Sequence, residues 1–156
     1  MTSLSEPTIG THSSAKTRPP IRFDTKIAIV LRDDLASWQK LNVAAFLASG
    51  IAGGDPDVIG QPYDDASGNG YLAMFRQPVL VFAGSGEAIR AAYDRAMARG
   101  LRLAIFTEAL FATGNDGDNR AAVRACPREA LVLVGFAFRA ERKAADKVLK
   151  GLALHR

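Results

Sequence analysis

The sequence predicts an α/β protein in which helices cover both faces of a sheet of four main strands. Short apolar runs at 27–31, 79–83 and 101–106 are typical of strands that are buried on both faces. Helical segments alternate with these runs, and a single residue, Gly100, separates one helix from the next strand. That order is typical of a parallel crossover. We therefore expect a three-layer α/β/α sandwich with a mostly parallel four-stranded sheet.

The first half of the chain should form a strand, a helix, a small hairpin and a second strand. The strand at 27–31 ends in a polar turn, and Ser37 is the expected N-cap of a helix that ends near Ala52. Residues 53–77 are rich in glycine, proline and aspartate, and an Asn-Gly pair within them predicts a hairpin. The strand at 79–83 follows.

The second half should repeat the alternation of helices and strands. We expect a helix at 87–99, a strand at 101–106, a short helix or turn after 107, a short helix at 120–125, a strand at 130–138 and a helix at 141–150. Gly151 ends the last helix, and Leu152 and Leu154 are expected to fold back on the core. Residues 26–156 should therefore form a single domain.

Residues 1–25 are expected to form a disordered extension, because they are rich in Ser, Thr and Pro and lack a hydrophobic period. They also lack the apolar core of a secretory signal. The chain has one cysteine, which excludes an internal disulfide framework and favours a cytoplasmic location. No apolar run approaches the roughly 20 residues of a membrane-spanning helix, so no membrane partner is expected.

The net charge of +4 is concentrated at the two ends of the chain. Residues 139–156 alone carry six basic side chains and two acidic ones. A solvated helix face explains this pattern, and so does a surface that contacts phosphates.

The chain lacks the residues that several common kinds of functional site require. One cysteine and two histidines are too few for a Cys/His zinc site, and His12 and His155 lie too close to the chain ends to serve as a packed catalytic base. Gly84-Ser85-Gly86 resembles part of a dinucleotide fingerprint, but Ile89 occupies the position of its third glycine. Adjacent aspartates such as Asp33-Asp34 are typical turn residues. We therefore predict no metal and no cofactor.

Polar side chains follow the ends of the first and third strands, where open α/β sheets bind ligands. The first strand ends at Arg32-Asp33-Asp34, and the next helix carries Trp38, Gln39 and Asn42; the third ends at Thr107-Glu108, with Thr113 and Asn115 beyond. If the strands are parallel, these groups lie on one edge. Asn42 suits either a hydrogen-bonding role in the core or a ligand contact.

Spaced segments resemble the type II peptidyl-tRNA hydrolases. The matching segments are 26–35 (KIAIVLRDDL), 42–45 (NVAA), Gln77-Pro78, 101–108, 133–135 (LVG) and 146–154 (DKVLKGLAL). Residues 38–45 (WQKLNVAA) and the segment from Phe106 to Gly114 resemble more closely a bacterial family of unknown function in that superfamily, the domain-of-unknown-function two-thousand (DUF2000) family. The resemblance implies a hydrolase-like fold, a mixed sheet whose last strand is antiparallel, and a homodimer.

The catalytic residues of the hydrolases carry over only in part. Their essential lysine falls on Asn42, and their glutamine four residues later falls on Phe46. Lys40 lies two residues before Asn42, on another side of the helix. The essential aspartate falls on Glu108, a conservative change, and the threonine falls beside Thr113. An amide at position 42 cannot supply a cation to the developing oxyanion.

Three functions follow from these residues. In the first, the chain binds or acts on a small polar ligand through catalytic candidates Asn42, Glu108 and Thr113, with Asp34, Trp38, Lys40 and Asn115 as binding residues. In the second, it is a working peptidyl-tRNA hydrolase that uses Lys40 as a displaced cation and its basic last helix to hold tRNA. In the third, it is an interaction protein without pocket chemistry.

Overall fold

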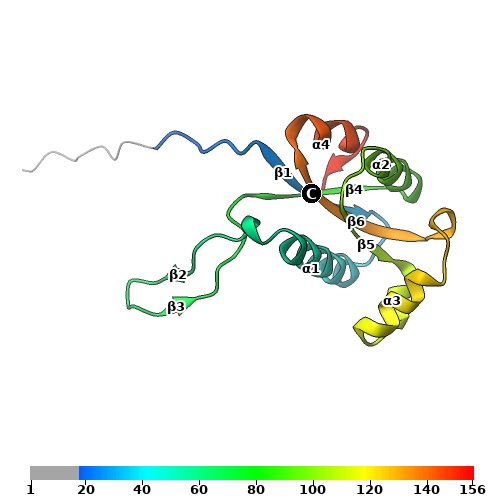
Figure 1. Cartoon of the computed structure of the whole chain (residues 1–156), viewed down its shortest axis with the longest axis horizontal. Helices are drawn as coiled ribbons and strands as arrows, with labels where there is room; N and C mark the ends of the chain where they lie inside the picture. Colours follow the sequence, from blue (N-terminus) through cyan, green and yellow to red (C-terminus); the bar gives the residue numbers. More distant parts are fainter. Residues whose placement is uncertain (1–17) are drawn as a thin grey trace, which may run out of the picture.

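Helices cover both faces of a central sheet in the computed structural model, which describes residues 18–156 (Figure 1). The sheet consists, in spatial order, of β5 (Leu103–Thr107), β6 (Leu133–Glu141), β1 (Thr25–Arg32), β4 (Val79–Gly84) and β7 (Ala153–Leu154). The helices are α1 (Ser37–Gly54), α2 (Gly86–Ala98), α3 (Asp116–Arg124) and α4 (Arg142–Leu149), with 3-10 turns η1 (Pro56–Val58), η2 (Glu108–Ala112) and η3 (Arg128–Ala130). The expected layered α/β architecture is confirmed.

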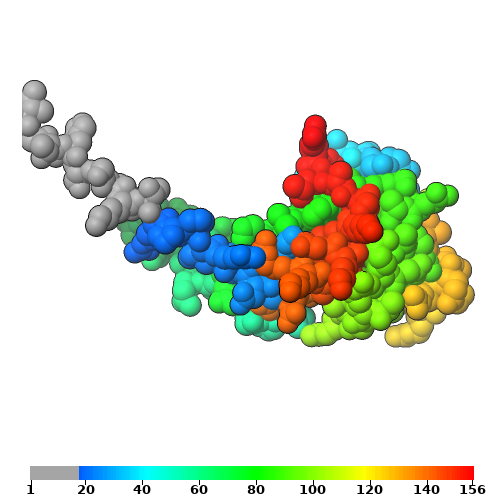
Figure 2. Space-filling model, turned by 90° about the horizontal axis from the view of Figure 1, so that it is seen from above, coloured from blue at the N-terminus to red at the C-terminus, as the bar shows by residue number. Residues whose placement is uncertain are grey.

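Each face of the sheet has its own apolar core. Alternate side chains of β1, Ile27, Ile29 and Leu31, pack with Val43 and Leu47 of α1. The other face packs on α2 and α4, which also contact each other. Figure 2 looks onto this second face, with α4 in orange and α2 in green. Helix α1 thus covers the first face, together with Val58 of η1 and with Leu110 and Phe111 of η2.

The sheet differs from the expectation in two respects. It has five strands rather than four, because 153–154 form β7, which pairs antiparallel with Phe82 and Ala83 of β4. Two residues are too few to show any periodicity, so the sequence gives no signal for such a strand. The sheet is also less parallel than expected: β1, β4 and β5 share one direction, but β6 lies antiparallel between β5 and β1, as the resemblance to the hydrolases implied. Within the described residues, β1 and β4 are thus the only neighbours that pair in parallel.

The ends of several helices and strands differ by a few residues from the ends that the sequence predicts. Ser37 is the first residue of α1 and Ala36 is its N-cap, where the side-chain oxygen of Gln39 accepts a hydrogen bond from the Ala36 N–H at 2.9 Å. Helix α3 begins four residues earlier than expected, because the Asn115 side chain caps it. Strand β6 runs three residues beyond Phe138. Of the extension expected over 1–25, residues 1–17 lie outside the described part.

The predicted hairpin is present. Its strands β2 (Tyr63–Asp64) and β3 (Gly70–Tyr71) form a projecting arm, residues 59–75, beyond the end of α1 (Figure 1, left). The carboxylate of Asp65 organises the tip, where it accepts hydrogen bonds from the side chain and N–H of Asn69, the N–H of Ser67 and the Tyr71 hydroxyl. These bonds, the Asn69 side chain first, lower the pKa of Asp65 to about 2.

Gly135 of β6 makes the closest approach between α1 and the sheet. A Cβ atom at this position would lie 2.9 Å from the Val30 carbonyl oxygen, 3.0 Å from Val43 Cγ1 and 3.1 Å from Leu47 Cδ1. Gly135 also pairs with Leu31 on one side and with Phe106 on the other. Its missing side chain therefore allows α1 to pack directly over the last residues of β1 and β5.

We expect Gly135→Ala to lower the free energy of unfolding by about 1–3 kcal/mol, because overpacking forces backbone and side chains apart. Gly114→Ala is the matched control, since a Cβ there would meet nothing within 4 Å. Urea denaturation of both variants measures the difference. Equal stabilities for the two variants would show that this contact does not limit the packing of α1.

Candidate functional site

The charged residues at the carboxyl ends of β1 and β5, the edge of the sheet where ligands were expected, lie on either side of β6. Leu31 and Phe106 both pair with Gly135, so β1 and β5 reach this edge at the same level. Arg32 is the last residue of β1, and Thr107 is the last of β5, just after a register shift in the β5–β6 ladder. With neighbouring strands about 4.8 Å apart, the two ends stand roughly 10 Å from each other.

Arg32 spans this distance. Its Nε donates to Asp34 Oδ1 at 2.6 Å, and its Nη1 donates to Glu108 Oε2 at 3.1 Å. The Arg32 side chain is only 19% exposed, whereas those of Asp34 and Glu108 are 64% and 58% exposed. The hydrogen bond to Asp34, and then that to Glu108, raise the pKa of Arg32 against the opposing effect of desolvation. The guanidinium is therefore a fixed cation between two accessible carboxylates.

A hollow of about 370 Å³ opens beside this triad. Its lining consists of Arg32, Asp34, Leu35, Gln39, Glu108, Phe111 and Ala112. The side-chain oxygen of Gln39 is engaged with the N–H of Ala36, so its amide nitrogen remains as a donor beside the hollow. The hollow thus combines a cation, two carboxylates, an amide and an apolar wall.

Aromatic side chains of α1, β5 and η2 form a wall beside the hollow. Trp38 meets Phe111 edge to face with ring centroids 5.9 Å apart, and Phe111 lies 5.1 Å from Phe106. Phe46 packs edge to face on Phe106 at 5.6 Å. Trp38 lies in this wall and is not among the residues that line the hollow.

The structure brings some of the predicted site residues together and separates others. Asp34 and Glu108 share Arg32, as described. Thr113 donates its hydroxyl to the Leu110 carbonyl and lies within hydrogen-bonding distance of the Asn119 side chain. Asn115 accepts from the Asp118 N–H at 2.9 Å and so caps α3. Thr113 and Asn115 thus have local structural roles, and neither lines the hollow.

Asn42 and Lys40 also lie away from the hollow. Asn42 is half-buried on the outer side of α1, between Trp38 and Phe46, and its amide makes no side-chain hydrogen bond within residues 18–156. Lys40 is half-buried and forms no ion pair in the same range. Arg32 was not among the predicted site residues, although a basic residue at the end of a buried strand, two positions before an aspartate, was a usable signal.

A second charged cluster lies at the opposite end of β1. Arg139 of β6 pairs with Asp55 and Asp57, which flank the start of η1, and lies 3.3 Å from Thr25 Oγ1. A hydrogen bond with the Asp57 carboxyl, and then the bond from the Arg139 guanidinium, lower the pKa of Asp55. These contacts tie the end of α1 to β6, beside another hollow of about 320 Å³ that Arg139 and Asp55 help to line.

The other sequence motifs have local explanations. The Ser85 hydroxyl accepts from the Ala88 N–H at 3.2 Å, so the Gly84-Ser85-Gly86 turn caps α2. In the described part of the chain, no three His, Cys, Asp or Glu side chains come close enough to hold a metal ion. Nor do residues 18–156 contain a helix with the length and apolarity needed to cross a membrane.

The family of this chain follows from its similarity to known proteins. The profile of a family described as "Protein of unknown function (DUF2000)" matches residues 25–156. The chain belongs to the DUF2000 family. A solved structure described as a protein of unknown function from Agrobacterium tumefaciens strain C58 is similar, with a TM-score of 0.84 and 46% sequence identity. The match covers 86% of this chain and all of the other. No curated protein matches this chain.

Proposed function

We propose that this DUF2000 protein binds a small polar ligand in the hollow beside Arg32 and Glu108. The observation that carries the proposal is the Arg32 side chain, which is held between two carboxylates while some of its guanidinium donors remain unused. Fixed charges of this kind need no reorganisation when a ligand arrives.

The charge of the triad indicates what kind of ligand fits. Two carboxylates against one guanidinium leave a formal charge of −1 at the mouth of the hollow. A ligand with an amino group or another donor is therefore favoured, and its acceptor atoms can use Arg32 and Gln39. Leu35 and Phe111 offer an apolar surface to the rest of such a ligand. A small amine that also carries an oxygen acceptor meets all of these conditions.

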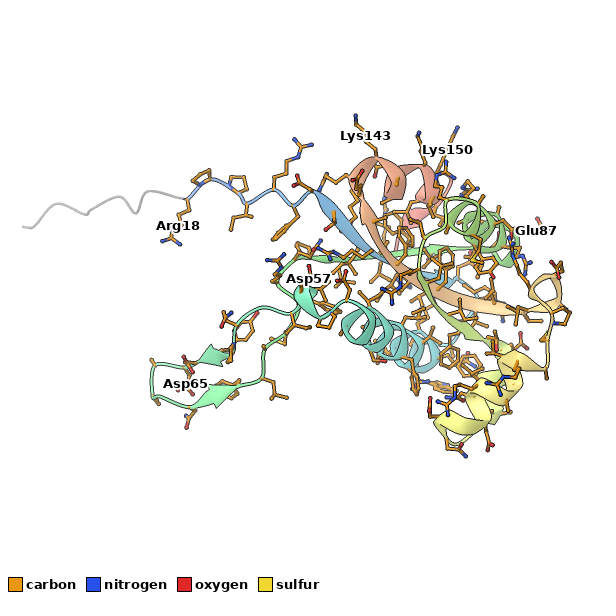
Figure 3. The ribbon with its side chains drawn as sticks, viewed as in Figure 1. Arg18, Asp57, Asp65, Glu87, Lys143 and Lys150 are labelled. Carbon is orange, nitrogen blue, oxygen red and sulfur yellow. The ribbon has the colours of Figure 1, made fainter. Side chains whose placement is uncertain are left out.

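The fold also supports a relationship to the type II peptidyl-tRNA hydrolases. The sequence likeness is accompanied by a mixed sheet with an antiparallel β6, as the resemblance implies. The basic residues of α4 and its C-cap Lys150, however, lie on the face of the sheet opposite to α1 (Figure 3, Lys143 and Lys150). A tRNA backbone held there would lie away from Glu108. We therefore favour a small ligand over tRNA, in a protein located in the cytoplasm.

The ligand prediction is tested with Glu108→Gln. We expect untargeted mass spectrometry to find an amine-bearing small molecule with the purified wild-type protein, and Glu108→Gln to bind that compound at least about tenfold more weakly, because a hydrogen bond to a charged group is lost. The matched control is Glu87→Gln, an exposed carboxylate at the start of α2 (Figure 3). Equal retention by Glu108→Gln and the control would refute the site.

We expect no useful cleavage of peptidyl-tRNA by the wild-type protein. Asn42 stands at the position that the resemblance assigns to the essential lysine, and Arg32 is engaged by Asp34 and Glu108. The measurement is hydrolysis of an N-blocked aminoacyl-tRNA by wild type, Asn42→Lys and Glu108→Ala. Wild-type turnover that disappears in Glu108→Ala would contradict this expectation and make Lys40 the next residue to test. Turnover gained in Asn42→Lys alone would show that only the cation is missing.

A further inference from the structure

We infer that the outer face of α1 is the interface with a second copy of this chain, and that the two α1 helices pack antiparallel. The outer face consists of Trp38, Leu41, Asn42, Ala45, Phe46, Ser49 and Gly53, which recur every three or four residues. The resemblance to the hydrolases implied a homodimer without saying which surface forms it. The surface described here supplies that assignment.

The outer face is too apolar for a helix that stays in water. Trp38 is 63% exposed, Leu41 is 73% exposed and Phe46 is 50% exposed, and no charged side chain lies among them. The buried side of the same helix, with Val43, Leu47 and Ile51, is also apolar. A helix that is apolar on both its inner and its outer face is expected to be covered on both faces. Exposed patches of this kind mark interaction sites.

The distribution of side-chain sizes indicates a second copy in the antiparallel direction. The first half of the face carries the bulky Trp38 and Leu41, whereas the second half carries Ser49 and Gly53. The middle of α1 lies between Ala45 and Phe46. A two-fold axis there places Trp38 of one copy against Gly53 of the other, with bulky side chains against small ones. Ala45 at the crossing point allows the helix axes to approach closely.

The same axis pairs the two polar side chains of the face. Asn42 and Ser49 lie equally far from the midpoint, about 5 Å along the helix, so each faces the other across the interface. Ser49 donates its hydroxyl to the Phe46 carbonyl at 2.6 Å, and its oxygen can still accept. The amide of Asn42, which has no side-chain partner within residues 18–156, can donate to it. The interface is thus self-complementary in polarity as well as in size.

The arm at 59–75 supports the same arrangement. It extends beyond the end of α1 (Figure 1) and exposes Tyr63, Leu72 and Met74, of which Leu72 is 88% exposed. An isolated two-stranded hairpin is marginal in water, so contacts beyond its own strands would stabilise it. In the antiparallel pair, the end of α1 that precedes the arm lies beside the start of the other α1. Each arm can then cover the exposed Trp38 of the second copy.

The area is consistent with a dimer only if the arms take part. Trp38, Leu41 and Phe46 together expose roughly 400 Å² per copy, about half of the 800 Å² that each partner buries in a standard interface. The apolar side chains of the arm are needed to supply most of the remainder. Loss of either the helix contact or the arm contact should therefore weaken the dimer.

Sedimentation velocity of the full chain tests the interface directly. We expect the wild-type protein to sediment at twice the chain mass of 16.6 kDa at micromolar concentrations. Ala45→Glu should be monomeric, because it places a charge at the crossing point of the two helices. Ala91→Glu is the matched control, since Ala91 is also an exposed alanine on a helix, and it should remain dimeric. Both variants should keep the wild-type circular dichroism.

Three results would overturn the assignment of this face. A wild-type protein that stays monomeric at high micromolar concentration would show that the outer face is not a contact between two copies of this chain. An Ala45→Glu variant that remains dimeric would place the interface elsewhere. Equal dissociation of Ala45→Glu and Ala91→Glu would show an unspecific effect of added charge.

Disulfide cross-linking tests the direction of the pair. In a Cys126→Ser background, copies with Asn42→Cys mixed with copies carrying Ser49→Cys should form a covalent dimer under mild oxidation. Each variant alone should cross-link weakly, because positions 42 and 49 oppose each other rather than themselves. Strong cross-linking of Asn42→Cys alone would indicate parallel helices and contradict the antiparallel arrangement.

Discussion

The position of β6 between β1 and β5 determines the arrangement of the whole charged edge. Strand β1, which ends at Arg32, and strand β5, which Glu108 follows, are not neighbours, so their ends stand apart by the width of one strand. Gly135 fills that gap with backbone only, which lets α1 pack over it. Arg32 then reaches across from β1 to Glu108. The hollow, its fixed cation and its aromatic wall all lie around this bridge.

This geometry separates the protein from the hydrolases that its sequence resembles. The cation comes from the end of a strand and is already paired with two carboxylates, whereas the resemblance places an essential lysine on α1, at Asn42. The outer face of α1 carries apolar side chains, among them Phe46 at the position of a polar residue in the hydrolases. We interpret the edge as a binding site and the outer face of α1 as a contact surface.

Much of the fold was predictable, because strands such as 27–31 and helices such as α1 extend over enough residues to show a clear pattern. Strand β7 was missed because it has two residues. The site was predictable only as far as the strand ends: Asp34 and Glu108 were placed on one edge, and they share Arg32. The local bonds of Thr113 and Asn115 and the span of Arg32 depend on tertiary contacts that no sequence spacing reveals.

We predict that Arg32 and Glu108 are energetically coupled across β6. A double-mutant cycle with Arg32→Met, Glu108→Gln and the double variant measures this coupling through the free energy of unfolding in urea. Because Glu108 is 58% exposed, we predict a modest coupling of roughly 0.3–1 kcal/mol that decreases as salt is added. Strictly additive effects at low salt would contradict the account, because the bridge would then contribute nothing to the edge.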